Sequence, residues 1–159
     1  MSRGRWFPWA MVVLGVLAIA CSGAERDDRG EIVGAGDVSA FEMRLGDCFD
    51  NPEDPTAPVS SLAAVPCEDP HDNQVFALID FPEGGDAFPG AQAIRDFATD
   101  ACLEQFEPFV GRSYEESRFD ISALYPSAES WDQGDREVIC VLLDTAGEPW
   151  TGTAEGRAE

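Results

Sequence analysis

Five cysteines constrain the fold of this 159-residue chain more than any other feature, because disulfides restrict both the spacing of the elements and the compartment of a small domain. Cys21 stands apart, at the end of an apolar N-terminal run. The other four are Cys48, Cys67, Cys102 and Cys140. In an exported chain, four cysteines predict two disulfides with three possible pairings. A zinc site built from them with His71 is the competing interpretation, but the sequence has neither a C-x-x-C pair nor a second histidine.

The N-terminus has the pattern of an export signal. Arg3 and Arg5 precede an uncharged run from Trp9 to Ala20. Those twelve residues span about 18 Å as a helix, well short of the roughly 30 Å hydrocarbon core of a membrane. We therefore expect residues 1–20 to be a signal peptide.

Small residues directly before Cys21 resemble the lipobox of bacterial lipoproteins, although Ala18 stands where that motif prefers a larger aliphatic residue. The resemblance implies that Cys21 is lipidated and becomes the mature N-terminus. The protein is then extracytoplasmic and anchored to the outer face of the cell membrane. An uncleaved N-terminal transmembrane anchor and plain secretion are the alternatives.

The chain is strongly acidic, and this restricts its partners. After residue 20, 8 arginines of the 10 basic residues remain against 31 acidic residues, a net charge of −23, and there is no lysine. Such a surface repels phosphate backbones and anionic headgroups, so nucleic acid is not an expected partner. Contact with the membrane would depend on the N-terminal lipid. The expected partners are an envelope protein or a cell-wall component.

Composition divides the rest of the chain into three parts. Residues 21–40 have few large apolar side chains and no periodicity, so we expect a lipid-anchored acidic linker. Residues 41–152 are long enough for one domain with a modest core. The last residues, 153–159, are expected to be a frayed tail.

Periodicity selects one disulfide pairing. Between residues 90 and 106 the apolar positions recur at steps of three and four, which predicts an amphipathic helix with Cys102 in its buried stripe. Pro108 and Gly111 are expected to end this helix. Residues 138–143 are a β-branched run that predicts a strand containing Cys140. If these two surfaces pack together, Cys102 pairs with Cys140, and Cys48 pairs with Cys67.

Further strands are expected at residues 47–49, 62–67, 74–81 and 119–125. One long helix between two groups of strands predicts an α+β fold, with a mostly antiparallel sheet, one main helix packed on one face, and two disulfides. Trp131 and Trp150 are expected to cover the edge of the core.

The chain resembles a bacterial family, the septum formation domain of exported and membrane-anchored proteins. The markers lie at residues 46–49, 65–71, 75–77, 88–90, 101–102, 109–111, 126, 131, 134–136, 140 and 151–153. They cover about residues 45–152. Gln74 stands where an acidic residue is frequent in the family. The resemblance implies an envelope role linked to septum formation and cell division, but it names no reaction.

Three side chains are candidates for partner binding, each with a structural alternative. His71 has the chemistry of a base or pH switch, but a lone histidine after proline in a turn more often bonds a backbone carbonyl. Arg136 lies just before a predicted strand, where a guanidinium clamps loop carbonyls or a carboxylate. Trp131 is either a contact residue or part of the core.

No catalytic residue, cofactor or metal is expected. Ser60 and Ser61 lack the G-x-S-x-G elbow, and the acidic loop 50–54 lacks the spacing of a calcium-binding EF-hand. Asp96 or Asp100 with Glu104 would suit a glycosidase pair, but they fall on the solvated side of the predicted helix. The expected function is a non-enzymatic cell-envelope lipoprotein with an extracytoplasmic binding domain. The alternative is an envelope enzyme, either a cell-wall hydrolase or a thiol-redox protein.

Overall fold

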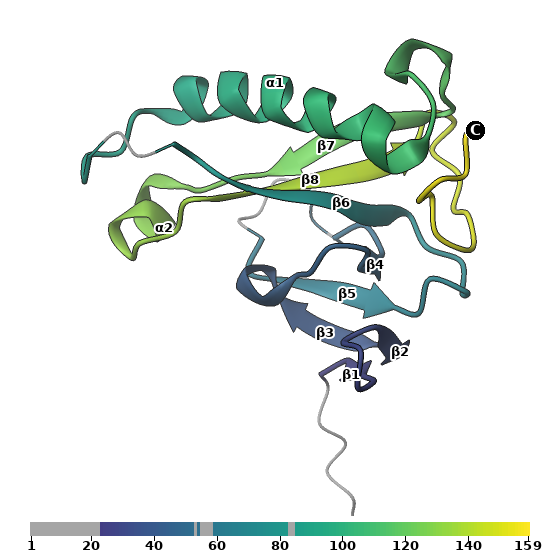
Figure 1. The fold of residues 1–159 in the computed structure, drawn as a ribbon. Helices are drawn as coiled ribbons and strands as arrows, with labels where there is room; N and C mark the ends of the chain where they lie inside the picture. The colour runs from purple at the N-terminus through teal and green to yellow at the C-terminus, as the bar shows by residue number, and fades with distance from the viewer. Residues whose placement is uncertain (1–22, 53, 55–58, 83–84) are drawn as a thin grey trace, which may run out of the picture.

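The computed structural model describes residues 23–52, 54, 59–82 and 85–159. The predicted signal peptide and Cys21 lie outside these described residues. One long helix lies across a six-stranded sheet, and a two-stranded sheet lies at the opposite end of the domain (Figure 1). The elements are β1 (Glu25–Arg26), β2 (Ile32–Gly34), β3 (Gly36–Ser39), η1 (Ala40–Glu42), β4 (Cys48–Phe49), β5 (Ser61–Val65), β6 (Asn73–Asp80), α1 (Ala91–Val110), η2 (Tyr114–Glu116), β7 (Phe119–Leu124), α2 (Ala128–Asp132) and β8 (Glu137–Asp144).

The strands of the large sheet follow the order β3-β5-β4-β6-β8-β7. All pairs between these named strands are antiparallel. The two longest strands, β6 and β8, pair with each other inside the sheet, where most of their apolar and β-branched residues are buried. The predicted α+β fold with one main helix on an antiparallel sheet is confirmed.

The long helix α1 buries one side chain in each turn. These side chains are Ile94, Ala98, Cys102, Phe106 and Val110. The helix ends at Gly111, as predicted, which adopts the left-handed conformation (φ 82°) and donates its N–H to the carbonyl of Glu107. The prediction that Pro108 also ends the helix is wrong. Pro108 lies in the last turn, where its missing N–H removes a single backbone bond and the helix continues to the glycine.

Strand β8 separates two hydrophobic clusters. Val138, Cys140 and Leu142 face the cluster beneath α1. Ile139 and Val141 face a second cluster, built with side chains from β3, β4 and β5. The half of the sheet formed by those three strands therefore curls under the half that carries the helix (Figure 1). The domain thus has a core on each face of its central strands.

The expectation of a solvated linker is wrong for the described part of residues 21–40. Strand β3 pairs with β5 at the edge of the large sheet, and Val38 is only 7% exposed in the second cluster. Arg26 places two nitrogens at 2.7 Å from the carboxylate oxygens of Asp47. The few apolar residues of this segment are spaced for short strands, so they fill the core without producing a long periodic pattern.

The expectation of a frayed tail at residues 153–159 is also wrong. Ala154 is fully buried in the cluster beneath α1. The N–H groups of Gly156 and Ala158 donate to the carbonyls of Phe109 and Val110, both at 2.8 Å. The tail therefore satisfies carbonyls at the C-terminal end of the helix, which have no partner within the helix.

Both predicted disulfides are present. Cys102–Cys140 joins α1 to β8, and Cys48–Cys67 joins β4 to the loop that follows β5. Cys48, Cys102 and Cys140 are fully buried. The Cys102–Cys140 bridge therefore fixes the helix to a central strand, whereas the Cys48–Cys67 bridge lies within the half of the sheet formed by β3, β5 and β4.

Loss of the Cys102–Cys140 bridge should strongly destabilise the domain. Closing this 38-residue separation restricts the unfolded chain, so we expect the double variant C102A/C140A to lose about 4 kcal/mol of unfolding free energy. Urea denaturation of the purified protein measures the loss, and the exposed Leu103→Ala serves as the control. A double variant as stable as the control would contradict the structural role of the bridge.

Candidate functional site

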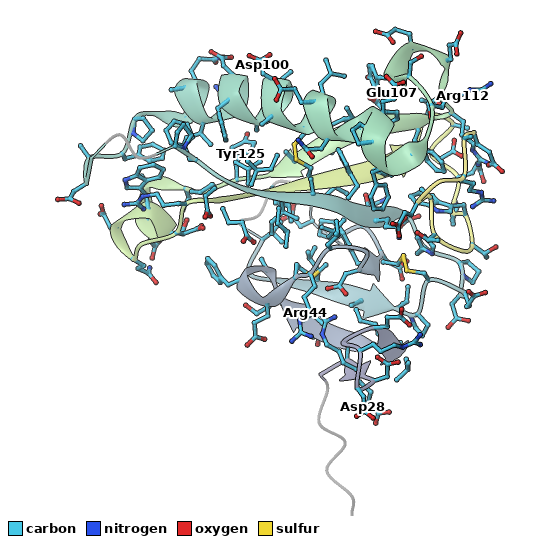
Figure 2. All side chains as sticks on the ribbon, viewed as in Figure 1. Asp28, Arg44, Asp100, Glu107, Arg112 and Tyr125 are labelled. Atoms are coloured by element: carbon cyan, nitrogen blue, oxygen red, sulfur yellow. A yellow bond between two sulfur atoms is a disulfide. The ribbon has the colours of Figure 1, made fainter. Side chains whose placement is uncertain are left out.

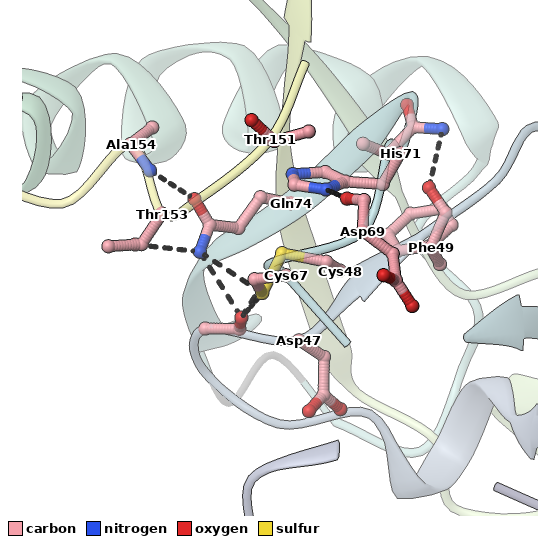
Figure 3. Close-up of a disulfide and its surroundings, with 12 residues drawn as sticks. Asp47, Cys48, Phe49, Cys67, Asp69, His71, Gln74, Thr151, Thr153 and Ala154 are labelled. Carbon is pink, nitrogen blue, oxygen red and sulfur yellow. Dashed lines mark hydrogen bonds between the residues drawn. A yellow bond between two sulfur atoms is a disulfide. The ribbon is translucent and has the colours of Figure 1, made fainter. Parts of the chain in front are cut away.

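His71 is fully buried and belongs to the core. Its backbone exchanges two hydrogen bonds of 3.0 Å with Trp150, and the two rings meet edge-on with centroids 4.6 Å apart. The ring Nδ1 lies 2.9 Å from the carbonyl oxygen of Asp69, so Nδ1 carries the proton in the neutral ring and donates (Figure 3). This is the contact expected of a structural histidine, and the ring does not reach the surface.

Burial lowers the pKa of the His71 imidazole, although the carbonyl of Asp69 and the carboxylates of Asp50 and Asp72 raise it in part. Arg157 adds to the lowering. The folded protein therefore holds this side chain neutral at pH values where the unfolded chain binds a proton.

This shift predicts a pH-dependent stability that His71→Asn removes. The folded pKa lies below the unfolded value of about 6.5, so the wild type is fully stabilised above that pH and loses unfolding free energy as the pH falls through it. Asparagine retains a donor for the Asp69 carbonyl but does not titrate. Urea denaturation from pH 7.5 to pH 5 should show a steeper decline for the wild type than for H71N. Parallel declines would contradict the shift.

Gln74 connects three distant parts of the chain. Its side chain is 1% exposed, and its Nε2 donates to the carbonyl of Gly46 at 3.2 Å and to Thr153 Oγ1 at 2.9 Å. Its Oε1 accepts the N–H of Ala154 at 2.7 Å (Figure 3). The Cys48–Cys67 disulfide lies beside this network. The amide both donates and accepts here, which a carboxylate cannot do while ionised.

Gln74→Glu should therefore destabilise the domain in a pH-dependent way. An ionised carboxylate would place an acceptor against the carbonyl of Gly46, so we expect a loss of about 1–3 kcal/mol at pH 7. The pKa of the new carboxyl should be raised in the folded state, so the deficit should grow as the pH rises above about 4.3. Thermal unfolding of Q74E and of the exposed control Glu155→Gln at pH 5 and pH 7 tests this. A pH-independent deficit would be evidence against it.

Arg136 and Trp131 form a clamp at the end of the sheet. Arg136 donates from one nitrogen to the carbonyls of Trp131 and Asp135, at 2.8 and 2.7 Å. Its guanidinium lies 3.7 Å from the centre of the Trp131 ring. Trp131 is 2% exposed and packs edge-on against Phe81 and Phe88. Both side chains are therefore engaged inside the domain.

The carboxylates on α1 that suit a glycosidase pair are solvated. Asp96, Asp100 and Glu104 all lie on its exposed face, and Figure 2 shows Asp100 on the side of the helix away from the sheet. Within residues 23–52, 54, 59–82 and 85–159, no group of three or more histidine, cysteine, aspartate or glutamate side chains is placed to hold a metal ion.

Several grooves hollow the described surface, and they include the two that follow. The first, of about 570 Å³, lies beside the Cys48–Cys67 disulfide and contains Arg29, Arg44 and the exposed Leu45. The second, of about 530 Å³, lies between η1 and α2, and we call it the seam groove. It is lined by Ala40, Phe41, Val59, Ser60, Ala123, Leu124, Tyr125, Ser127, Glu129, Ser130, Gln133, Asp135, Glu137 and Ile139. Sequence patterns do not reveal this groove, because its lining comes from four separated segments.

Among the described residues, no helix is long and apolar enough to cross a bilayer.

A curled antiparallel sheet, one covering helix and two disulfides define a disulfide-bonded α+β domain, which is consistent with an extracytoplasmic protein. Residues 30–158 match the family described as septum formation, and the chain belongs to this family. The match begins earlier than the sequence markers suggested and includes β2 and β3. Comparison with curated proteins gave no match, and comparison with solved structures gave none either. Membership indicates a role related to septum formation.

Proposed function

We propose that this protein is a non-enzymatic cell-envelope lipoprotein whose extracytoplasmic domain binds a partner protein or a cell-wall component during septum formation. The observation that carries the proposal is the pair of disulfides, one between α1 and β8 and the other in the half of the sheet formed by β3, β5 and β4. Such bridges persist in oxidising compartments outside the cytoplasm. The family match supports the link to septum formation.

The polar side chains considered for a functional site form hydrogen bonds inside the domain, which supports binding rather than catalysis. His71, Gln74 and Arg136 hold backbone carbonyls, and none of them is exposed. The apolar side chains of Phe41 and Leu45, by contrast, are 64% and 62% exposed. Exposed apolar groups beside grooves are typical of contact surfaces for other molecules.

Lipidation of Cys21 would orient this domain. Gly23, the first described residue, bridges to Asp37 in β3, at the end of the domain that carries β1 and β2. Two residues of extended chain span only about 7 Å, so a lipid on Cys21 would hold that end close to the membrane. Helix α1 lies on the opposite side of the domain and would face away from it (Figure 1).

Crosslinking in intact cells tests the binding role. A photoreactive amino acid placed in turn at Phe41, Leu45, Asp69 and Leu103 samples four exposed positions. We expect one position to capture one envelope protein or wall fragment reproducibly, because specific binding buries one surface and leaves the others free.

The Cys21→Ala variant serves as the control for anchoring in the same cells. Loss of the captured product in this variant would indicate that contact with the partner depends on the lipid. Equal capture of many unrelated envelope proteins from all four positions would contradict a binding domain.

A further inference from the structure

The seam groove lies where the two ends of the curled sheet approach each other. β3 and β7 are the first and last strands in the sheet order. Ala40 and Phe41 directly follow β3, and Leu124 and Tyr125 lie at the end of β7, yet all four line the same groove. Leu124 also packs against the second hydrophobic cluster. The groove is therefore the opening between two sheet edges.

Its surface combines apolar and aromatic groups. Ile139 and Leu124 form part of the lining, and both belong to or pack against the second cluster. Phe41 and Tyr125 are 64% and 40% exposed. Aromatic rings placed this way offer contact area to an apolar side chain and their faces to a cation.

The charged side chains that the described residues contribute to the seam groove are all acidic. Glu129, Asp135 and Glu137 line it, whereas no arginine or histidine among the described residues does. Arg136 is the nearest cation in the sequence, but its guanidinium donates to carbonyls and stacks on Trp131. The carboxylate of Glu137 has no basic partner among the described residues, and burial together with Asp80 and Asp135 raises its pKa. An incoming cation would relieve this repulsion.

We propose that the seam groove binds an extended segment of a partner protein that carries lysine or arginine beside apolar side chains. This inference rests on the proposed binding function and names the surface and the chemistry of its partner. The carboxylates and aromatic faces receive the cations, and the apolar lining receives the neighbouring side chains. The groove beside Cys48–Cys67 lacks this uniform charge, because Arg29 and Arg44 line it.

A second copy of this chain does not fit as the occupant. Both copies would carry a net charge of −23 after residue 20, and they would bring like charges together at the groove. Addition of a strand along the whole of β7 does not fit either. The N–H groups of Phe119 and Ile121 already donate to Ser117 Oγ and Asp120 Oδ1, so the first part of that edge is closed.

A random library of linear twelve-residue peptides displayed on phage, selected on the purified full chain in detergent, tests the proposal. We expect enrichment of peptides with lysine or arginine beside apolar residues. The strongest peptide, labelled with fluorescein, then serves as the probe for fluorescence polarisation. Phe41→Asp should weaken its binding at least about tenfold, as expected for a central aromatic contact. E129Q/E137Q should weaken it and make it less sensitive to salt.

Matched variants away from the groove should leave binding unchanged. These are Leu45→Asp, an equally exposed apolar position, and D100N/E104Q, which removes two charges from α1. Selection of acidic or charge-free peptides, absence of any selected peptide, or equal weakening by the groove and control variants would overturn the proposal. Specific capture in cells from Leu45 or Leu103 alone would show that the partner binds elsewhere. It would overturn the seam groove as the binding site and leave the proposed binding function intact.

Discussion

Strand β8 is buried on both of its faces, and every other part of the domain depends on that arrangement. Val138, Cys140 and Leu142 meet the helix side, whereas Ile139 and Val141 meet the curled half of the sheet. A strand with a single buried face would leave one of these clusters in water. The helix, the edge strands and the tail thus pack against two faces of one central pair, β6 and β8. The Cys102–Cys140 bridge then fixes the helix to the strand that both cores share.

The disulfides also explain how so acidic a chain remains folded. A net charge of −23 after residue 20 favours expansion of the chain through self-repulsion. Two ion pairs hold carboxylates that are nearly buried, Arg26 with Asp47 and Arg118 with Asp144. Eight arginines are too few to neutralise the acidic side chains. The two disulfides restrict the unfolded chain independently of its charge, so they offset the repulsion. A lipid anchor near β1 would add no compensating positive charge.

The parts of the fold that the sequence could predict have a local signature. Apolar residues at helical spacing around Cys102 predict the helix, and β-branched residues around Cys140 predict the strand. Together they predict the bridge between the two elements. Val38 and Ala154 are single apolar residues in polar surroundings, and only a distant partner decides that they are buried. The seam groove was beyond prediction for the same reason. Its residues come from positions 40–41, 59–60, 123–130 and 133–139, and only the curl of the sheet brings them together.

The acidity of the domain surface does not by itself make binding specific, because a cationic partner would be attracted to almost every exposed face of the domain. Discrimination requires a place where attraction, apolar contact and geometry coincide. The exposed carboxylates of α1 supply charge over a helix whose apolar stripe is already buried. At the seam groove, Glu129 and Glu137 stand beside Phe41, Tyr125 and an apolar lining that the sheet leaves open. Salt would therefore screen the general attraction more than binding at this groove, where apolar contacts contribute independently of ionic strength.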